Sequence, residues 1–127
     1  MVLRLPLAAA LGAIIGYQRE RAGKPVGLRD NLLICVGAAL FTISSIYGFG
    51  SDADAAMVAA GVVAGIGFLG AATIIRRGEG IIEGLTTATT IWSVAAIGLA
   101  TGAGLYWISA VATAIILIAL FLPSRTR

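Results

Sequence analysis

Residues 85–122 read LTTATTIWSVAAIGLATGAGLYWISAVATAIILIALFL and contain no charged side chain. This run is long enough for two helices that each approach the ~20 residues needed to cross a bilayer. The rest of the chain follows the same pattern, with short charged clusters between apolar stretches. The chain of 127 residues is 59% hydrophobic and 12% charged, whereas a soluble domain carries about 25% charged residues. The sequence therefore predicts an integral membrane protein.

We predict a single domain over residues 1–127 with an all-α fold, an integral membrane bundle of about five transmembrane helices. The expected spans are residues 3–18, 31–49, 55–75, 85–100 and 105–122, and Pro123 ends the last of them. If the spans alternate in direction, the loops 19–30 and 76–84 and the C-terminal tail lie on one side of the membrane.

The basic residues give the orientation of these spans. One side carries only Arg4, and the other side carries eight basic residues: Arg19, Arg21, Lys24, Arg29, Arg76, Arg77, Arg125 and Arg127. Loops rich in lysine and arginine stay in the cytoplasm. We therefore expect the N-terminus outside and the C-terminus in the cytoplasm. The net charge of +3 is explained by these loops, so no nucleic-acid partner is expected.

The two predicted hairpins resemble each other. A shift of 57 positions superposes Arg19 on Arg76, Gly23 on Gly80 and Gly27 on Gly84. The same shift places Leu28 on Leu85. Both hairpins would start outside, so the chain would contain a parallel internal repeat of its first and second helix pairs. Chance similarity in an apolar sequence is the alternative.

Small residues indicate where membrane helices pack, because lipid offers no hydrophobic drive for helix association. Glycines of the span 55–75 fall on two faces, so we expect this helix to lie centrally. A homo-oligomer, with a dimer favoured, is also consistent with so many small residues, although packing within the chain would use the same positions. The expected packing residues are Gly12, Gly16, Gly61, Gly65, Gly67, Gly70, Gly98 and Gly102.

The chain offers no recognisable catalytic, metal or cofactor site. Residues 65–70 match the spacing G-x-G-x-x-G, but they lie inside an apolar helix instead of at a strand-to-helix turn. There is no histidine, and Cys35 is the single cysteine. We therefore predict no cofactor, no metal ligand and no nucleophile–base pair, and an enzyme is the least expected class.

Charged residues gather at the predicted cytoplasmic ends of the helices. Helices beginning after Gly27 and Gly84 would add the positive ends of their dipoles there. The cluster could bind an anion, or it could only orient the chain and contact lipid. Its carboxylates could form structural locks with arginines or a cation entry site. The candidate residues are Arg19, Glu20, Arg29, Asp30, Arg76 and Arg77.

Hydroxyl side chains form a second candidate feature on the span 85–100. Thr86, Thr90 and Ser93 follow helical spacing and share one face. They could bond within or between helices, or line a polar vestibule. Trp92 lies mid-span, so its indole N–H is expected to need a partner. No carboxylate lies mid-span, so a monomeric magnesium site within the membrane is not expected.

Several segments together resemble the MgtC/SapB family of bacterial membrane proteins. They are residues 16–21 (GYQRER), 27–29 (GLR), 37–41 (GAALF), 65–71 (GIGFLGA), 84–89 (GLTTAT) and Trp92. The resemblance covers nearly the whole chain, and its motif positions include Arg19, Glu20, Arg29, Gly67, Gly70, Gly84, Thr86 and Thr87. Asp30 departs from the family pattern, in which threonine usually follows Gly-Leu-Arg.

The resemblance implies a protein of the bacterial inner membrane linked to growth at low magnesium. Family members look like regulators of membrane partners, including the ATP synthase and cation-transport systems. Many carry a cytoplasmic domain after the fifth helix, and we expect functions of that domain not to transfer to this chain. The resemblance thus implies a non-enzymatic modulator of another membrane protein. A small oligomeric transporter or channel and an anionic-lipid-binding scaffold remain the alternatives.

Overall fold

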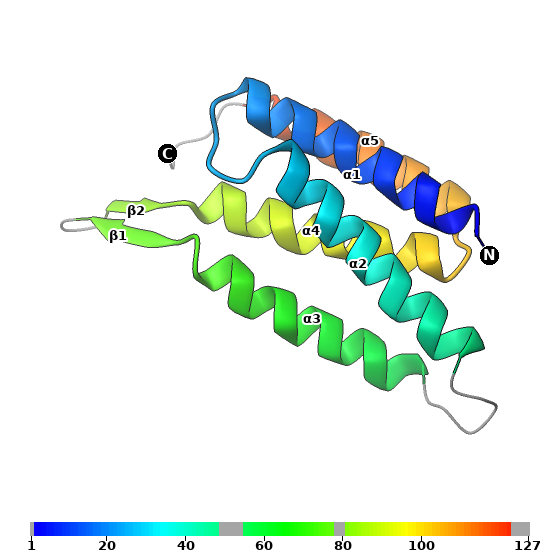
Figure 1. Cartoon of the computed structure of the whole chain (residues 1–127). Helices are drawn as coiled ribbons and strands as arrows, with labels where there is room; N and C mark the ends of the chain where they lie inside the picture. The colour runs from blue at the N-terminus through cyan, green and yellow to red at the C-terminus, as the bar shows by residue number, and fades with distance from the viewer. Residues whose placement is uncertain (1, 49–54, 78–80, 123–127) are drawn as a thin grey trace.

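The computed structural model describes residues 2–48, 55–77 and 81–122, and side chains are described for these residues except 55, 75–77 and 81–83. The described elements follow one another as shown in Figure 1: α1 (Arg4–Arg21), α2 (Leu28–Tyr47), α3 (Ala55–Ala71), β1 (Ile75–Arg77), β2 (Ile81–Glu83), α4 (Leu85–Gly102) and α5 (Tyr106–Leu120).

A short β-hairpin replaces the loop expected between the third and fourth helices. The sequence predicts a helix to residue 75, but α3 ends at Ala71, and Ile75 begins β1. The two strands pair antiparallel, with Ile75 opposite Glu83. Isoleucine stands at positions 74, 75, 81 and 82, and β-branched side chains favour extended backbone over helix. Apart from this hairpin, the regular elements of the described chain are helices.

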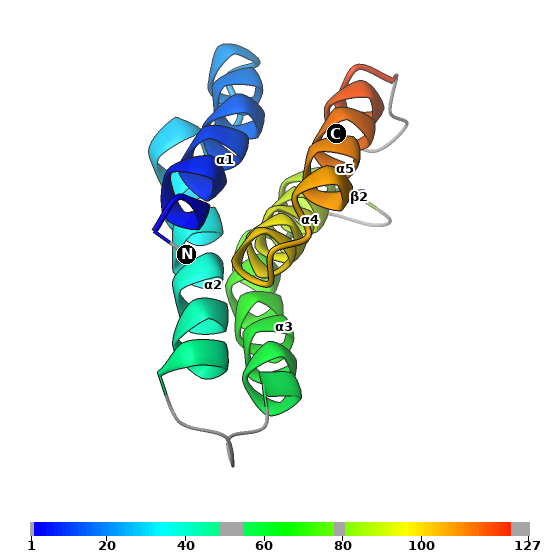
Figure 2. The ribbon, with the colours of Figure 1, turned by 90° about the vertical axis from the view of Figure 1, so that its right-hand side faces the viewer.

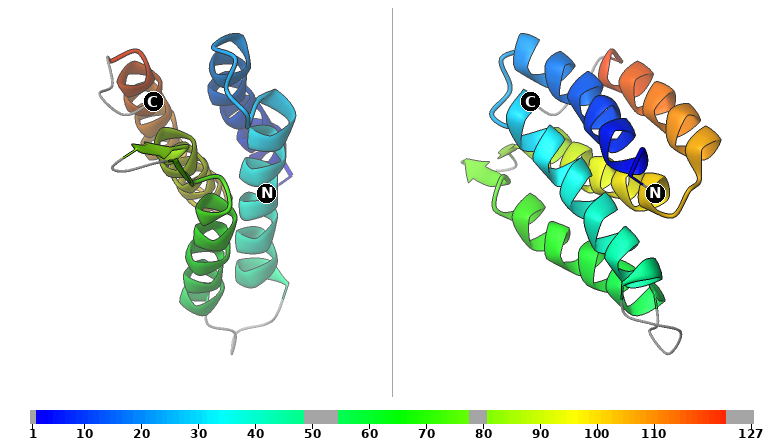
Figure 3. Two further views of the ribbon diagram at one scale, coloured as in Figure 1. Left: turned by 90° about the vertical axis from the view of Figure 1, so that its left-hand side faces the viewer. Right: turned by 45° about the vertical axis from the view of Figure 1, so that its right-hand side comes forward.

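The helices form two layers. Figures 2 and 3 show α1 beside α2 in one layer and α3, α4 and α5 side by side in the other. Helices α2 and α4 both begin at the end of the molecule that carries the hairpin (Figure 1). The main core lies between α1, α2 and α4 and contains Ala8, Leu11, Ile15, Cys35, Ala39, Val94 and Ile97.

Four of the predicted packing glycines hold α1 and α4 against α2. A Cβ atom on Gly12 would lie 2.7 Å from Cys35 Cβ, and one on Gly16 would lie 2.8 Å from Leu28 Cα. A Cβ on Gly102 would lie 2.6 Å from the Ala39 carbonyl oxygen, and one on Gly98 would also collide with the α2 backbone. Only glycine permits such backbone approach.

The prediction of a central third helix is wrong, because α3 lies at the edge of its layer (Figure 2). A Cβ placed on Gly61, Gly65 or Gly67 would meet no atom of the described residues within 4 Å. Gly70 does meet a neighbour, because its Cβ would lie 3.4 Å from the Ala88 carbonyl oxygen. The glycines of α3 therefore contribute little to packing within the chain, and α2 and α4 take the central place instead.

Two described helices, α2 and α4, are long and apolar enough to cross a membrane by length and composition. The apolar helices α3 and α5 are shorter. Helix α1 carries Arg4 in its first turn and Arg19, Glu20 and Arg21 in its last. With these four charged residues, α1 is not among the helices that are apolar enough to cross a membrane by length and composition.

Candidate functional site

The predicted charged cluster contains one deeply buried member, Arg19, in the last turn of α1. The Arg19 side chain is 3% exposed. Its Nη2 donates a hydrogen bond to Thr87 Oγ1 at 2.8 Å, which joins α1 to the first turn of α4. The Arg19 Nε is buried and has no hydrogen-bond partner among the described residues. Arginine stays charged at physiological pH.

The Glu20 carboxylate is hydrogen-bonded to the backbone of α2 and not to an arginine. Its Oε1 accepts a hydrogen bond from the Leu28 backbone N–H at 3.3 Å, so a carboxylate lies at the positive end of the α2 dipole. Arg29 and Asp30 are exposed, and no ion pair joins them to other described residues. The predicted lock between carboxylates and arginines is therefore absent from the described part of the cluster.

Arg76 and Arg77 complete the predicted cluster, and both lie in β1. Their side chains lie outside the described residues. The structure thus brings Arg19 to Thr87 and Glu20 to Leu28, but it leaves Arg29 and Asp30 as exposed side chains outside both contacts.

Asn31 belongs to this region, although sequence reasoning missed it. The Asn31 side chain is fully buried, and its Nδ2 donates to the carbonyl oxygens of Gly27 at 2.8 Å and Val26 at 3.2 Å. These bonds tie the loop before α2 to the first turn of the helix. An asparagine directly after charged residues at a helix start was the available signal.

On the hydroxyl face of α4, Thr90 is the member whose hydroxyl bonds to its own helix. Thr90 is buried, and its Oγ1 donates to the Thr86 carbonyl oxygen at 2.7 Å. Ser93 is partly exposed. The Thr86 and Ser93 hydroxyls form no hydrogen bond to other described residues, so the structural use expected for this face is seen for Thr90 alone. Trp92 is 54% exposed, and no hydrogen bond to its indole is found among the described residues.

The described surface carries several apolar grooves, and two of them have volumes of ≈ 680 and ≈ 670 Å³. The first, which we call the α2–α3 groove, has a volume of ≈ 680 Å³ and exposes the small residues Gly37, Gly61 and Gly65 among aliphatic side chains. Packing between the described parts of the chain leaves these glycines open. Exposed small residues on an apolar helix face are the surface that membrane helices use to approach one another.

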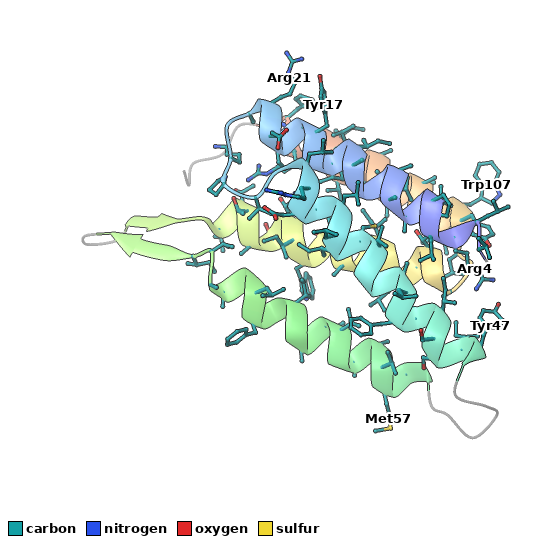
Figure 4. The ribbon with its side chains drawn as sticks, in the orientation of Figure 1. Arg4, Tyr17, Arg21, Tyr47, Met57 and Trp107 are labelled. Atoms are coloured by element: carbon teal, nitrogen blue, oxygen red, sulfur yellow. The ribbon has the colours of Figure 1, made fainter. Side chains whose placement is uncertain are left out.

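The second groove, the α1–α5 groove, has a volume of ≈ 670 Å³. It lies between residues 13–22 at the end of α1 and residues Leu117 and Phe121 at the end of α5, with Leu28 at its side. Tyr17 and Arg21 both line it, and their side chains point the same way (Figure 4). Their i, i+4 spacing on one helix face was the signal that sequence reasoning did not use.

At the opposite end of the bundle, Arg4 of α1 contacts residues of three other helices. Its Nη1 donates to the Gly102 carbonyl oxygen at 2.8 Å, and its Nε donates to the Tyr106 hydroxyl at 3.0 Å. The guanidinium also lies 5.2 Å from the centre of the Tyr47 ring, and Figure 4 shows Arg4 and Tyr47 at this end. A cation at the carbonyl end of α4 is favourable. Arg4 thus holds α1, α2, α4 and α5 together.

No group of three metal-ligating side chains occurs within the described parts of the chain. The arrangement offers hydrogen-bonded arginines, backbone contacts at helix ends and two apolar grooves.

Comparison with known proteins places the chain among bacterial relatives. The family model described as the MgtC family matches residues 5–127. The chain is 46% identical over 112 residues to the "Putative magnesium transporter YhiD" of Escherichia coli strain K12, covering 83% of the chain and 52% of that protein. No solved structure matches the chain.

Two further relatives have different names. The "Protein SapB" of Bacillus subtilis is 39% identical over 135 residues, covering 100% of the chain and 58% of that protein. The "Protein MgtC" of Brucella abortus is 46% identical over 110 residues, covering 87% of the chain and 45% of that protein. The chain therefore spans about half the length of the curated relatives it matches.

Proposed function

Because the chain belongs to the MgtC family, we propose that it is a non-enzymatic module of the bacterial inner membrane that helps cells adapt to low magnesium by binding other membrane proteins. The observation that carries this proposal is the α2–α3 groove, where Gly37, Gly61 and Gly65 stay open after the chain has folded. A glycine costs helix stability, so a glycine face without an internal contact is best explained by an external one.

In this proposal all five helices cross the bilayer, with the N-terminus outside and the C-terminus in the cytoplasm. The basic ends of α1 and α2 and the β1–β2 hairpin then face the cytoplasm, as the distribution of arginine and lysine requires. The α1–α2 and α3–α4 pairs form the parallel repeat. Support comes from α2 and α4, which both start after a glycine at the same end of the bundle (Figure 1).

The orientation is tested by labelling cysteines in intact cells. The native Cys35 is buried, so an added cysteine reports its own position. Lys24→Cys should react with a membrane-impermeant thiol reagent only after the membrane is opened. Tyr47→Cys, at the other end of α2 (Figure 4), should react in intact cells. The reverse order, or equal labelling of both, contradicts the topology.

We propose that an apolar helix of another membrane protein occupies the α2–α3 groove. Its lining is aliphatic apart from the glycines and Phe41, which suits a transmembrane helix and not a soluble ligand. The homodimer expected from the sequence stays a prediction, and a second copy of the chain is the rival occupant.

The decisive experiment compares two glycines of α3. Gly65 lines the groove, whereas Gly67 does not, and a Cβ placed on either would meet no atom of the described residues within 4 Å. Gly65→Leu should fold normally yet fail to rescue growth at low magnesium in a strain deleted for its own copy. Gly67→Leu is the matched control and should rescue. Equal rescue by both variants contradicts the groove as the functional surface.

The same pair separates the rival occupants. If Gly65→Leu converts a dimer of the purified chain into a monomer, the groove belongs to a second copy. If the purified wild type is a monomer and Gly65→Leu loses crosslinks to another membrane protein, the proposed occupant is supported.

Transport is the second candidate function, because one relative carries the name of a magnesium transporter. The path would run between protomers, since Thr90 in the single chain is bonded to its own helix. Purified protein in liposomes tests this directly. Saturable magnesium flux would favour transport and contradict the non-enzymatic modulator.

A further inference from the structure

The α1–α5 groove is matched in length to one leaflet of a bilayer. It follows α1 from Ala13 to Arg21 and ends at Ala22, the residue after the helix. The eight helical steps rise about 12 Å at ~1.5 Å per residue. Half of the hydrocarbon core is about 15 Å thick. Its volume of ≈ 670 Å³ also falls within the range of about 300–1,000 Å³ that is usual for ligand sites.

The groove ends at a positive charge that another residue holds in place. Arg21 Nη1 donates to the Tyr17 hydroxyl at 3.0 Å, and the guanidinium lies 5.7 Å from the centre of the Tyr17 ring. No ion pair to Arg21 occurs among the described residues. The guanidinium therefore retains free donors, and the Tyr17 hydroxyl, which accepts from Arg21, retains its own proton for a further acceptor.

A buried acceptor completes the polar end. Gln18 lines the groove between Tyr17 and Arg21, and its Oε1 is buried without a hydrogen-bond partner in the described part of the chain. An unsatisfied buried carbonyl is costly unless a donor reaches it. Since this oxygen is shielded from solvent, a rotation of the Gln18 side chain into the groove would bring it to a ligand hydroxyl. A ligand that offers both an oxyanion and a hydroxyl would then satisfy the whole set.

We propose that the α1–α5 groove binds one phosphatidylglycerol molecule of the cytoplasmic leaflet. An acyl chain lies along α1 against Leu117 and Phe121, and the phosphate accepts hydrogen bonds from Arg21 and Tyr17. A hydroxyl of the glycerol headgroup donates to Gln18. The choice of leaflet rests on the proposed orientation of the helices, but the site does not depend on the α2–α3 groove or its partner.

Native mass spectrometry of the purified full chain tests the headgroup contact, with phosphatidylglycerol and phosphatidylcholine as probes. The wild type should bind phosphatidylglycerol more tightly than phosphatidylcholine. Arg21→Gln should weaken phosphatidylglycerol binding by roughly five- to tenfold, since a basic residue near an anionic headgroup contributes about 1 kcal/mol or somewhat more. Arg29→Gln is the matched control, because Arg29 is exposed near the same end but does not line the groove; it should change binding less than twofold.

A second pair of variants tests the acyl-chain contact. Ala13 lines the groove, whereas Ala10 is exposed on α1 outside it. Ala13→Phe should fill the groove and reduce the binding of both lipids, while Ala10→Phe should bind as the wild type does. Ala13 is partly exposed in the groove and Ala10 is exposed outside it, so folding is expected to survive in each.

Three results would overturn the proposal. The first is equal weakening by Arg21→Gln and Arg29→Gln, which would indicate diffuse charge attraction. The second is a wild type that prefers neither lipid. The third is a change of oligomeric state in Ala13→Phe without loss of lipid, which would assign the groove to another protein chain. Because binding is measured on the purified chain, these results are independent of the growth test on Gly65.

Discussion

Replacing Gly12 with alanine should weaken the contact between α1 and α2, whereas replacing Gly37 should not. The new Cβ on Gly12 would lie 2.7 Å from Cys35 Cβ, 2.9 Å from the Asn31 carbonyl oxygen and 3.2 Å from Leu32 Cα. Ordinary van der Waals contact begins at 3.4 Å. All three atoms belong to or adjoin the α2 backbone, so a side-chain rotation cannot relieve the overlap and the helices must separate.

Both variants gain helix stability from the replacement of glycine by alanine. Alanine is a better helix former than glycine by about 0.8–1 kcal/mol in a helix interior, and both glycines lie well inside their helices. A Cβ on Gly37 would meet no described atom within 4 Å, so this variant should be as stable as the wild type or more stable by up to about 1 kcal/mol. Overpacking typically costs about 1–3 kcal/mol, and the backbone overlap at Gly12 places that variant in the upper part of this range. The expected difference in unfolding free energy is therefore about 2–3 kcal/mol.

The measurement is the free energy of unfolding in mixed micelles, followed by far-ultraviolet circular dichroism during titration with sodium dodecyl sulfate. The comparison between the two variants cancels the helix-propensity term and reports the contact alone. A difference below about 0.5 kcal/mol would show that the close approach of α1 to α2 is wrong, since overpacking against backbone costs more than that.

Two further matched pairs follow from the site. Thr87→Val removes the hydrogen bond that the buried Arg19 guanidinium donates to α4 and should lower the unfolding free energy by about 1–3 kcal/mol. Thr90→Val removes a bond within its own helix and should lower the unfolding free energy by about 1 kcal/mol or less. Equal losses in the two variants would refute the importance of the α1–α4 bond. Gly84 and Gly23 both have positive φ angles, 87° and 74°, so alanine at either should cost about 1 kcal/mol. In Gly84→Ala the new Cβ also collides with a neighbouring backbone, so this variant should unfold at a lower concentration of sodium dodecyl sulfate than Gly23→Ala. The reverse order would contradict the structure of the turn before α4.

The helices could be predicted from the sequence more completely than the contacts of the candidate site. Charge-free runs such as residues 85–122 determined the number and approximate bounds of the helices, because apolar length and charge placement are local properties. The glycine pairs at Gly12 and Gly98 were also identified correctly as contact positions. The same pattern at Gly61 and Gly65 produced the wrong placement of α3, because a glycine face looks the same whether its neighbour is within the chain or outside it.

Contacts between residues far apart in the chain could not be predicted from the sequence. Nothing local distinguishes Arg19, which is buried against Thr87, from Arg29, which is exposed. The same holds for Tyr17 and Arg21, whose role depends on α5 lying apart from α1 to leave a groove.

By itself, then, the sequence determined that this chain forms apolar helices with basic ends at one side, since hydropathy and charge act residue by residue. Only the tertiary structure decided which glycines are covered, which arginine is buried and where two grooves stay open. Those properties depend on which helix faces meet, and that choice reflects the sum of many weak packing contacts across the whole bundle.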